Sequence, residues 1–144
     1  MYLSTQDTLD TSAYFTVGLV GGALEFDVDL SRSGCGCITA LYAVVMPATA
    51  NDNNDPFQYC DGASVGGSAC PEFDMMEANM YAWRSTSHKC DSNGSNYSNC
   101  DVPGSCSTDV LTDKPSGVYA PGSTSGIDTT RTFHMKQEFH ESNG

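Results

Sequence analysis

An all-β fold is predicted for this chain of 144 residues by two segments with strand patterns and by the scarcity of helical pattern elsewhere. Residues 24–30 (LEFDVDL) alternate apolar and acidic side chains without exception, so a strand here would have one apolar face and one face with three carboxylates. Residues 38–46 (ITALYAVVM) form an apolar run rich in β-branched and aromatic residues, which is typical of a strand covered on both faces. The length fits one domain, and 39% hydrophobic residues is too high for a wholly disordered chain.

The remaining segments are assigned from composition and alternation. Helical pattern is confined to residues 74–84 (DMMEANMYAWR), but Met, Tyr and Trp are equally at home in strands, and we expect a strand because the surrounding segments are β. Residues 91–126 are mostly Ser, Asn, Asp, Gly, Thr and Pro, and we expect loops pinned by Cys90, Cys100 and Cys106. Alternation returns in residues 129–139 (TTRTFHMKQEF), which predicts a last strand.

The charge balance restricts the partners of the protein. Six Lys and Arg residues stand against 18 Asp and Glu residues, which gives a formal net charge of −12. Nucleic acids and anionic membrane surfaces repel such a body, because binding to either depends on basic side chains that neutralise phosphate. The longest apolar run has about ten residues, whereas a membrane-spanning helix needs about 20. We therefore expect no nucleic-acid partner, no membrane partner and no transmembrane helix.

Seven cysteines in 144 residues suit an oxidising compartment, and their odd number leaves at least one without a partner in this chain. Two sequons, Asn93-Gly-Ser and Asn96-Tyr-Ser, support a secreted glycoprotein. Neither a basic leader nor an apolar segment follows Met1, so we expect no signal peptide in this chain. We therefore expect a mature, processed or truncated form of a secreted protein.

The densest group of functional side chains lies in residues 70–79 (CPEFDMMEAN) and 86–90 (TSHKC). In a strand, Glu72 and Asp74 project from the same face, close enough to share a proton. Glu77 would lie roughly 16 Å from Glu72 and on the opposite face of a straight strand. Two carboxyls that act as a retaining glycosidase pair are about 5–5.5 Å apart, so this pairing requires a bulge or bend. The spacing alone favours solvated carboxylates on a polar strand face.

A motif with the spacing Glu-x-Asp-x-x-Glu-Ala-Asn, followed downstream by His-x-Cys, resembles the central part of glycoside hydrolase family seven. That family contains retaining cellobiohydrolases and endoglucanases built on a concanavalin-like β-jelly roll sandwich. The resemblance implies that residues 1–144 form an incomplete central portion of one such catalytic domain. The matches run in order along the chain and are residues 25–31 (EFDVDLS), 35–36 (CG), 40–42 (ALY), 59–61 (YCD), 70–79 (CPEFDMMEAN), 88–90 (HKC), 119–123 (YAPGS), 128–130 (DTT) and 137–139 (QEF).

The resemblance implies a role for each candidate site residue. Glu72 would be the nucleophile, Asp74 its proton-sharing partner and Glu77 the acid/base, while His88 would lie in the catalytic subsite. The cleft would be lined by Tyr42, Tyr59, Asp61 and Thr86. Taken alone, His88 is equally explained as a surface histidine beside a disulfide, Tyr42 as a core residue, and Asp61 and Thr86 as ordinary loop residues. The substrate would be a β-1,4-linked polysaccharide, with no cofactor required.

Trp83, the only tryptophan, is expected to pack in the core, because the platform tryptophans of the family lie elsewhere in the sequence. The resemblance also pairs Cys60 with Cys70 and Cys90 with Cys100. It leaves Cys35 and Cys106 to partners outside the chain and gives Cys37 no counterpart.

Two loops are shorter than in the cellobiohydrolases of the family, residues 47–59 and 61–69. This shortening implies an open, endo-acting cleft. The resemblance also implies that the full-length protein is a monomer. The basic residues that the family places between Cys90 and Tyr119 are reduced to Lys114. Because of that loss, a non-catalytic carbohydrate-binding jelly roll stays an alternative to an active enzyme. A cellobiohydrolase of the same family is a further alternative.

A calcium loop in residues 51–55 (NDNND) is a weaker alternative. The segment lacks the later Gly and Glu of an EF-hand, and ordinary surface-loop composition explains it. No Cys and His spacing resembles a closed zinc site, so we expect no metal.

Overall fold

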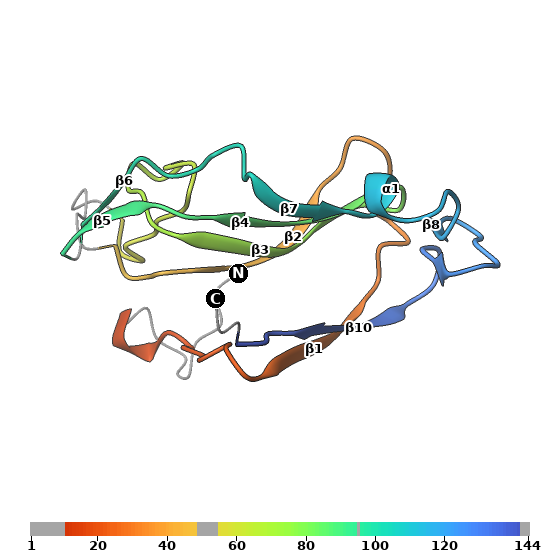
Figure 1. The fold of residues 1–144 in the computed structure, drawn as a ribbon, viewed down its shortest axis with the longest axis horizontal. Coiled ribbons are helices and arrows are strands. Elements are labelled where there is room, and N and C mark those ends of the chain that lie inside the picture. Colours follow the sequence, from red (N-terminus) through yellow and green to blue (C-terminus); the bar gives the residue numbers. More distant parts are fainter. Residues whose placement is uncertain (1–10, 49–54, 95, 142–144) are drawn as a thin grey trace. The chain divides into compact units, whose positions relative to one another are not determined.

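The computed structural model describes residues 11–48, 55–94 and 96–141, and these residues form mainly β-strands (Figure 1). The predicted all-β fold is confirmed, with a single helical turn α1 and a short 3-10 helix η1 as additions. In chain order the elements are η1 (Thr11–Ala13), β1 (Ala23–Val28), β2 (Thr39–Val44), β3 (Glu72–Ala78), β4 (Trp83–His88), β5 (Asp91–Asn93), β6 (Asn96–Ser98), β7 (Cys106–Asp109), α1 (Val110–Asp113), β8 (Tyr119–Ala120), β9 (Ile127–Asp128) and β10 (Phe133–Glu138).

Four strands form one sheet in the order β2-β3-β4-β7. The other strands pair in twos: β1 with β10 and β5 with β6 are antiparallel, and β8 with β9 is parallel. Because β3 and β4 are the two inner strands of the four-stranded sheet, side chains on them are flanked by a neighbouring strand on each side. These two strands carry most of the candidate site residues.

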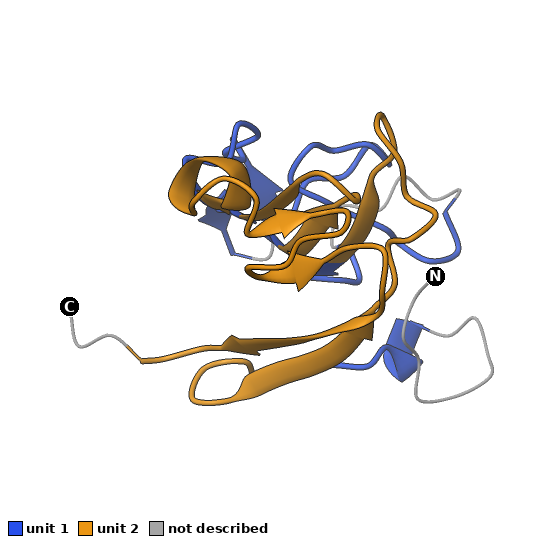
Figure 2. Ribbon diagram, turned by 90° about the vertical axis from the view of Figure 1, so that its right-hand side faces the viewer, with its two compact units in different colours: residues 1–16, 42–74, 86–107 blue, residues 17–41, 75–85, 108–144 orange. Residues whose placement is uncertain are grey.

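The described residues divide into two compact units (Figure 2). Unit 1 contains residues 1–16, 42–74 and 86–107. Its core is small and is built on the Cys60–Cys70 disulfide and Ala48, with Val44, Met46 and Tyr97 packed against them. Unit 1 therefore depends on a covalent bridge where a larger domain would have more apolar side chains.

Unit 2 contains residues 17–41, 75–85 and 108–144 and has the larger apolar core. The buried residues that form this core cluster are Val28, Leu30, Met76, Ala78 and Tyr119. Three aromatic rings pack edge-on or tilted, with the Trp83 ring 6.3 Å from that of Tyr119 and 6.1 Å from that of Phe133. The prediction that Trp83 has a packing role is confirmed, since it is partly buried against this core.

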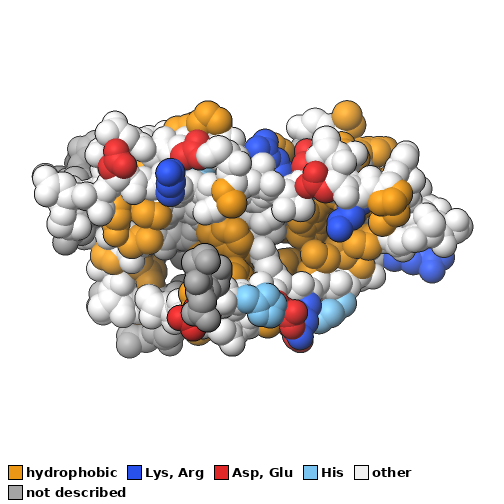
Figure 3. Space-filling model, viewed as in Figure 1, with side chains coloured by type: hydrophobic (Ala, Val, Ile, Leu, Met, Phe, Trp, Pro, Cys, Tyr) orange, Lys and Arg blue, Asp and Glu red, His pale blue; other side chains and the backbone are white. Residues whose placement is uncertain are grey.

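Strands β1 and β10 match the alternation predicted for residues 24–30 and 129–139. The pairs Phe26–Met135 and Val28–Phe133 lie in register, and these apolar residues pack in or against the core of unit 2. On the exposed side, His134 Nδ1 lies 3.0 Å from Asp27 Oδ1. Acidic, basic and histidine side chains gather over β1 and β10 in Figure 3. Alternation in the sequence thus determined which face is buried.

Strand β2 forms where residues 38–46 predicted a strand, but the expectation that it is covered on both faces was wrong. Ile38 is 72% exposed and Val45 is 48% exposed. Ile38 and Val45 flank β2, none of whose own residues is fully buried, and β2 is also an edge strand with one lateral neighbour. An apolar run indicates a tendency to be buried, but it does not indicate which other elements of the fold will cover it.

Residues 74–84 are β, as expected, but they are split between β3 and β4. The break is a turn in which the Asn79 side chain accepts hydrogen bonds from the backbone N–H groups of Tyr81 and Ala82. The Asn79 N–H donates to the Ala82 carbonyl at 2.9 Å. Asn is a common turn former because its side chain can bond to nearby backbone groups in this way.

Residues 91–126 contain more structure than the predicted loops. Strands β5 to β8 and α1 all lie in this stretch, and β9 (Ile127–Asp128) follows directly after it. These short elements are mostly exposed and are held by backbone hydrogen bonds, by an Asp109 side chain that caps α1 through the Leu111 N–H, and by a disulfide that brackets the β5–β6 hairpin. A prediction based on apolar residues misses elements that bury few of them.

Both disulfides implied by the resemblance are present, Cys60–Cys70 and Cys90–Cys100. Cys35, Cys37 and Cys106 are exposed and unpaired in the described part of the chain. None of the helices within those residues is long and apolar enough to cross a membrane. The proposed calcium loop at 51–55 lies, except for its last residue, outside the described residues.

Candidate active site

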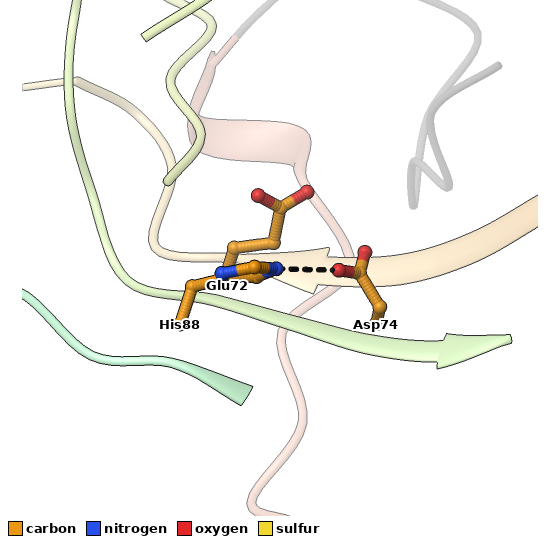
Figure 4. Close-up of side chains that lie close together, drawn as sticks. All are labelled: Glu72, Asp74 and His88. Carbon is orange, nitrogen blue, oxygen red and sulfur yellow. Dashed lines mark hydrogen bonds and ion pairs between the residues drawn. The ribbon is translucent and has the colours of Figure 1, made fainter. Parts of the chain in front are cut away.

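Adjacent strands β3 and β4 bring three candidate residues of unit 1 together: Glu72, Asp74 and His88 (Figure 4). One side-chain donor or acceptor atom from each lies within 4.8 Å of the other two. Glu72 and Asp74 are two residues apart on β3, so the prediction that they project from one face is consistent with this grouping. The geometry therefore places two carboxylates and an imidazole within reach of shared protons.

Hydrogen bonds fix the orientation of the His88 ring. Its Nδ1 lies 2.6 Å from the Asp101 backbone carbonyl oxygen, which can only accept, so Nδ1–H is the donor. Its Nε2 lies 3.0 Å from Asp74 Oδ2. Because two acceptors cannot form this second contact, one proton must lie on either the ring nitrogen or the carboxyl. His88 and Asp74 are therefore an imidazolium–carboxylate pair or a neutral pair, and in both forms they share one proton.

The environment raises the pKa of all three groups. Burial raises the pKa of Glu72, and the negative charges of Asp74 and Asp61 add to the increase. Burial also raises the pKa of Asp74, although His88 opposes the increase. Burial alone would lower the pKa of His88, but the Asp101 carbonyl and the two nearby carboxylates outweigh it and raise that pKa. The group therefore retains protons to higher pH than its members would in water.

Asp74 is 5% exposed, so the alternative of solvated carboxylates on a polar strand face is wrong for this residue. Glu72 is half-buried and its Oε2 accepts a hydrogen bond from the Gly62 backbone N–H at 3.0 Å. That amide counteracts the effect of burial on the Glu72 pKa. The alternative that makes His88 a surface histidine is also wrong, because its side chain is mostly buried and bonded at both ring nitrogens.

A second group in unit 1 joins Tyr42, Tyr59 and Asp61. The hydroxyls of Tyr42 and Tyr59 lie 3.2 Å apart. Burial raises the pKa of Tyr59, and hydrogen bonds with Tyr42 and Asp61 raise it further. Tyr42 is 39% exposed, so the alternative that places it in the core was wrong. Asp61 is buried, where its Oδ1 accepts from the Val65 N–H.

Thr86 is only 2% exposed, and its Oγ1 is the one buried side-chain polar atom without a hydrogen-bond partner among the described residues. Glu77 is half-buried on the part of β3 that belongs to unit 2. Its pairing with Glu72, which lies in unit 1, stays a prediction. The cleft-lining roles of Thr86 and of Tyr42, Tyr59 and Asp61 stay predictions as well.

Sequence reasoning missed the backbone groups at this site. The Gly62 N–H and the Asp101 C=O contact the two key side chains, and Gly104 packs beside His88. A backbone group carries no residue-type signal of its own. The available clue was a glycine that follows shortly after a disulfide cysteine in both cases, Gly62 after Cys60 and Gly104 after Cys100.

The same three side chains are the group among the described residues with the geometry to hold a metal ion. One imidazole nitrogen and two carboxylates are ligand types that divalent transition metals accept. The same atoms also form hydrogen bonds that require no metal ion: Glu72 Oε2 accepts from the Gly62 N–H at 3.0 Å, and His88 Nε2 lies 3.0 Å from Asp74 Oδ2.

No protein-family model matches the chain. Curated relatives do: the chain is 30% identical over 151 aligned positions to endoglucanase EG-1 of Hypocrea jecorina, and equally to that of Trichoderma longibrachiatum. The alignment covers 91% of this chain and 31% of the relative in each case, so the chain spans about a third of the length of these relatives.

Solved structures agree with the sequence comparison. An endoglucanase I complexed with cellobiose aligns with a TM-score of 0.75 and 23% identity, over 90% of this chain and 40% of that one. A cellobiohydrolase from Melanocarpus albomyces complexed with cellotetraose aligns with a TM-score of 0.62 and 26% identity, over 85% and 40%. A cellobiohydrolase of family GH7 from Daphnia pulex aligns with a TM-score of 0.65 and 23% identity, over 82% and 38%.

The mostly β-strand fold thus aligns with part of the jelly roll of these enzymes. The chain is a homologue of glycoside hydrolase family 7, and it corresponds to a portion of the proteins in that family.

Proposed function

We propose that the chain is part of the catalytic domain of a retaining endo-β-1,4-glucanase that hydrolyses cellulose or a related β-glucan. One observation carries the proposal: Glu72, Asp74 and His88 form a proton-sharing group in a homologue of family 7 cellulases. The relatives named endoglucanase and the structure solved with cellobiose support this substrate class. The substrate is uncharged, so the net charge of −12 does not oppose its binding.

Glu72 acts as the nucleophile. The Gly62 N–H holds its Oε2, which leaves Oε1 to attack the anomeric carbon and form a covalent glycosyl intermediate. Attack requires the ionised form; burial raises the Glu72 pKa, and the Gly62 N–H and the nearby His88 oppose part of that increase and so favour ionisation. Asp74 positions His88 through the 3.0 Å contact with Nε2. The proton that Asp74 and His88 share thus stays next to the nucleophile.

Glu77 acts as the acid/base. It protonates the departing glucosyl oxygen in the first step and deprotonates the attacking water in the second, so the anomeric configuration is retained. Short loops at 47–59 and 61–69 favour an open cleft and endo action. No cofactor takes part. The protein that contains the chain is a secreted monomer, and the exposed Asn93 and Asn96 of the β5–β6 hairpin are its glycosylation sites.

A soluble β-1,4-glucan tests the proposal on the complete gene product that contains this chain. We expect new reducing ends, release of the β-anomer first by NMR, and loss of activity in Glu72→Gln. Glu77→Gln should reduce kcat by about 10²–10⁴-fold. Asp27→Asn is the matched control, because Asp27 is an exposed carboxylate on β1. Unchanged activity in Glu72→Gln would overturn the assignment.

The mode of attack is tested separately. Endo action lowers viscosity steeply for each reducing end formed, whereas a cellobiohydrolase releases cellobiose with little change in viscosity. The scarcity of basic residues between Cys90 and Tyr119 favours a second candidate, a non-catalytic carbohydrate-binding jelly roll. Glucan binding without hydrolysis in the wild-type protein would support that candidate.

A further inference from the structure

We propose that Gly62 and Gly104 are positioning residues, whose lack of side chains creates the space in which the His88 imidazole and the Glu72 carboxylate are held. The proposal rests on the function proposed above for these two side chains. Its evidence is the space at each glycine, which any larger residue would fill.

Gly62 lies against both catalytic side chains. A Cβ at this position would lie 2.9 Å from His88 Cβ, 3.3 Å from His88 Cγ and 3.2 Å from Glu72 Oε2. Carbon atoms in contact are normally about 3.5–4.0 Å apart, so the first two contacts are too close. The same residue donates its N–H to Glu72 Oε2 at 3.0 Å. A glycine here allows the amide to approach the carboxylate while the histidine packs on the same backbone.

Gly104 lies at the Nδ1–Cε1 edge of the imidazole. A Cβ here would lie 3.0 Å from His88 Cε1 and 3.4 Å from His88 Nδ1, and it would overlap Thr86 Cγ2. Its φ of +65° is in the left-handed region that favours glycine. The Gly104 N–H donates at 3.1 Å to the Asp101 carbonyl, the same oxygen that accepts the His88 Nδ1–H. This turn therefore both packs against the ring and orients it.

Each glycine is placed by a segment that a disulfide anchors. Gly62 lies within the loop closed by Cys60–Cys70, where the Cys70 N–H donates to the Asp61 carbonyl at 3.1 Å. Gly104 lies four residues after Cys100, in a turn where the Asp101 N–H donates to the Lys89 carbonyl at 2.8 Å. The two disulfides of unit 1 thus hold the two backbone segments that contact His88.

Gly62→Ala and Gly104→Ala test the proposal in the complete gene product, with kcat and the titration of His88 by NMR as readouts. Displacement of a reacting group by about 1 Å can cost about 10²-fold in rate, so we expect kcat losses of about that size. A displaced imidazole also loses part of its contact with the Asp101 carbonyl and Asp74, so its titration midpoint should move to lower pH. A change in stability alone would leave the midpoint of the folded protein unchanged.

Two other glycines provide matched controls. Gly94 has a φ of +66° and no atom within 4 Å of a built Cβ, so Gly94→Ala carries the same backbone strain as Gly104→Ala without the contacts. Gly34 also has open space around it and no positive φ, which makes Gly34→Ala the control for Gly62→Ala. Kcat and the His88 midpoint should stay at wild-type values in both controls.

A rescue distinguishes positioning from misfolding. Thr86→Ser removes the Cγ2 that Gly104→Ala would overlap, so the double variant should recover part of the lost rate. If Gly104→Ala does not fold, Gly62→Ala alone tests the proposal. A Cβ at residue 62 makes less severe contacts, the nearest being 2.9 Å from His88 Cβ. Wild-type kcat and His88 titration in Gly62→Ala, or in a folded Gly104→Ala, would overturn the proposal. If the wild-type protein hydrolyses no glucan, the proposed function fails, and the His88 titration still decides the positioning role.

Discussion

Unit 1 and unit 2 are each stabilised internally by different kinds of interaction. The core cluster of unit 2 has five buried apolar residues and three packed aromatic rings around it, whereas the core of unit 1 is built around Cys60, Cys70 and Ala48. Unit 1 buries two carboxylates, Asp61 and Asp74, whereas the buried polar residues of unit 2 are the neutral Ser33 and Thr129. Burial of carboxylates is costly unless they are bonded. The comparison teaches that the unit with the candidate site is stabilised less by apolar packing and more by disulfides and by hydrogen bonds between ionisable side chains.

The largest expected effect is on unit 2. Leu30 is fully buried, with 0% of its surface exposed, so Leu30→Ala should lower the free energy of unfolding by about 2–5 kcal/mol through lost burial and the cavity left behind. Val20→Ala is the control, because Val20 is 72% exposed. Hydrogen exchange should localise the loss to amides of unit 2. Equal loss in amides of unit 1 would show that the units unfold together.

Removal of the Cys60–Cys70 disulfide is the corresponding test of unit 1. The double variant Cys60→Ser and Cys70→Ser should cost about 2–4 kcal/mol, because the bridge restricts the unfolded chain and forms the centre of the small core. Cys37→Ser is the control, because Cys37 is exposed and unpaired and the resemblance gives it no disulfide counterpart. Denaturant unfolding and exchange at Gly62 and His88 amides measure the effect. Unit 1 amides that keep wild-type protection would contradict this account.

The two units should respond to pH in opposite directions. The folded state raises the pKa of Glu72, Asp74 and His88, so their contribution to stability is present at acid pH and is lost as pH rises through those values. Hydrogen bonds to Thr130 lower the pKa of Asp128, and a hydrogen bond to Lys136 lowers that of Glu138, so their contribution in unit 2 is lost as pH falls.

Exchange protection followed from about pH 2 to pH 8 measures this difference, because the lowered pKa values of Asp128 and Glu138 act only below about pH 4.5. Protection of unit 1 should decrease across the range, and Asp74→Asn should flatten that decrease. Asp27→Asn, on the exposed side of β1, is the control and should leave it intact. A unit 1 that gains protection as pH rises would show that the carboxylates are stabilised in their charged form.

The smallest expected effect concerns the Tyr42–Tyr59 contact. Tyr42→Phe removes one hydrogen bond of 3.2 Å in a partly exposed site and should cost about 0.5 kcal/mol or slightly more. Tyr81→Phe, in unit 2, is the control at a similarly exposed position. Thermal unfolding measures both. If Tyr42 also lines the cleft, KM for the glucan should increase more than kcat decreases.

Patterns in the sequence predicted the parts of the fold that depend on periodicity. The alternation in residues 24–30 predicted the buried face of β1, and the grouping of Glu72 with Asp74 followed from their spacing on a strand. The exposure of Ile38, just before β2, was not predictable, because it depends on which elements cover this segment and not on its own residue type. The turn at Asn79 was missed for a related reason: one side chain that bonds to two backbone amides ended a segment that otherwise favours a strand.

The residue roles at the site came from the resemblance to a family, and the distances came only from the fold. Nothing in the sequence placed the Asp101 carbonyl next to His88, since the two are 13 residues apart and the group involved is backbone. The same holds for the Gly62 amide, ten residues from Glu72. Contacts of backbone groups depend on loop paths, and loop paths are the least periodic part of a chain.

The fixed Nδ1–H of His88 has a consequence for kinetics. Since this nitrogen keeps its proton, every titration at the ring concerns Nε2, whose proton is shared with Asp74 and lies near Glu72. Interacting groups of this kind release protons in macroscopic steps that belong to the set and not to single residues. An acid limb in a plot of kcat/KM against pH would therefore report the coupled titration of Glu72 and Asp74 on β3 and His88 on β4. A substitution at any of these three residues would shift the pH of that limb.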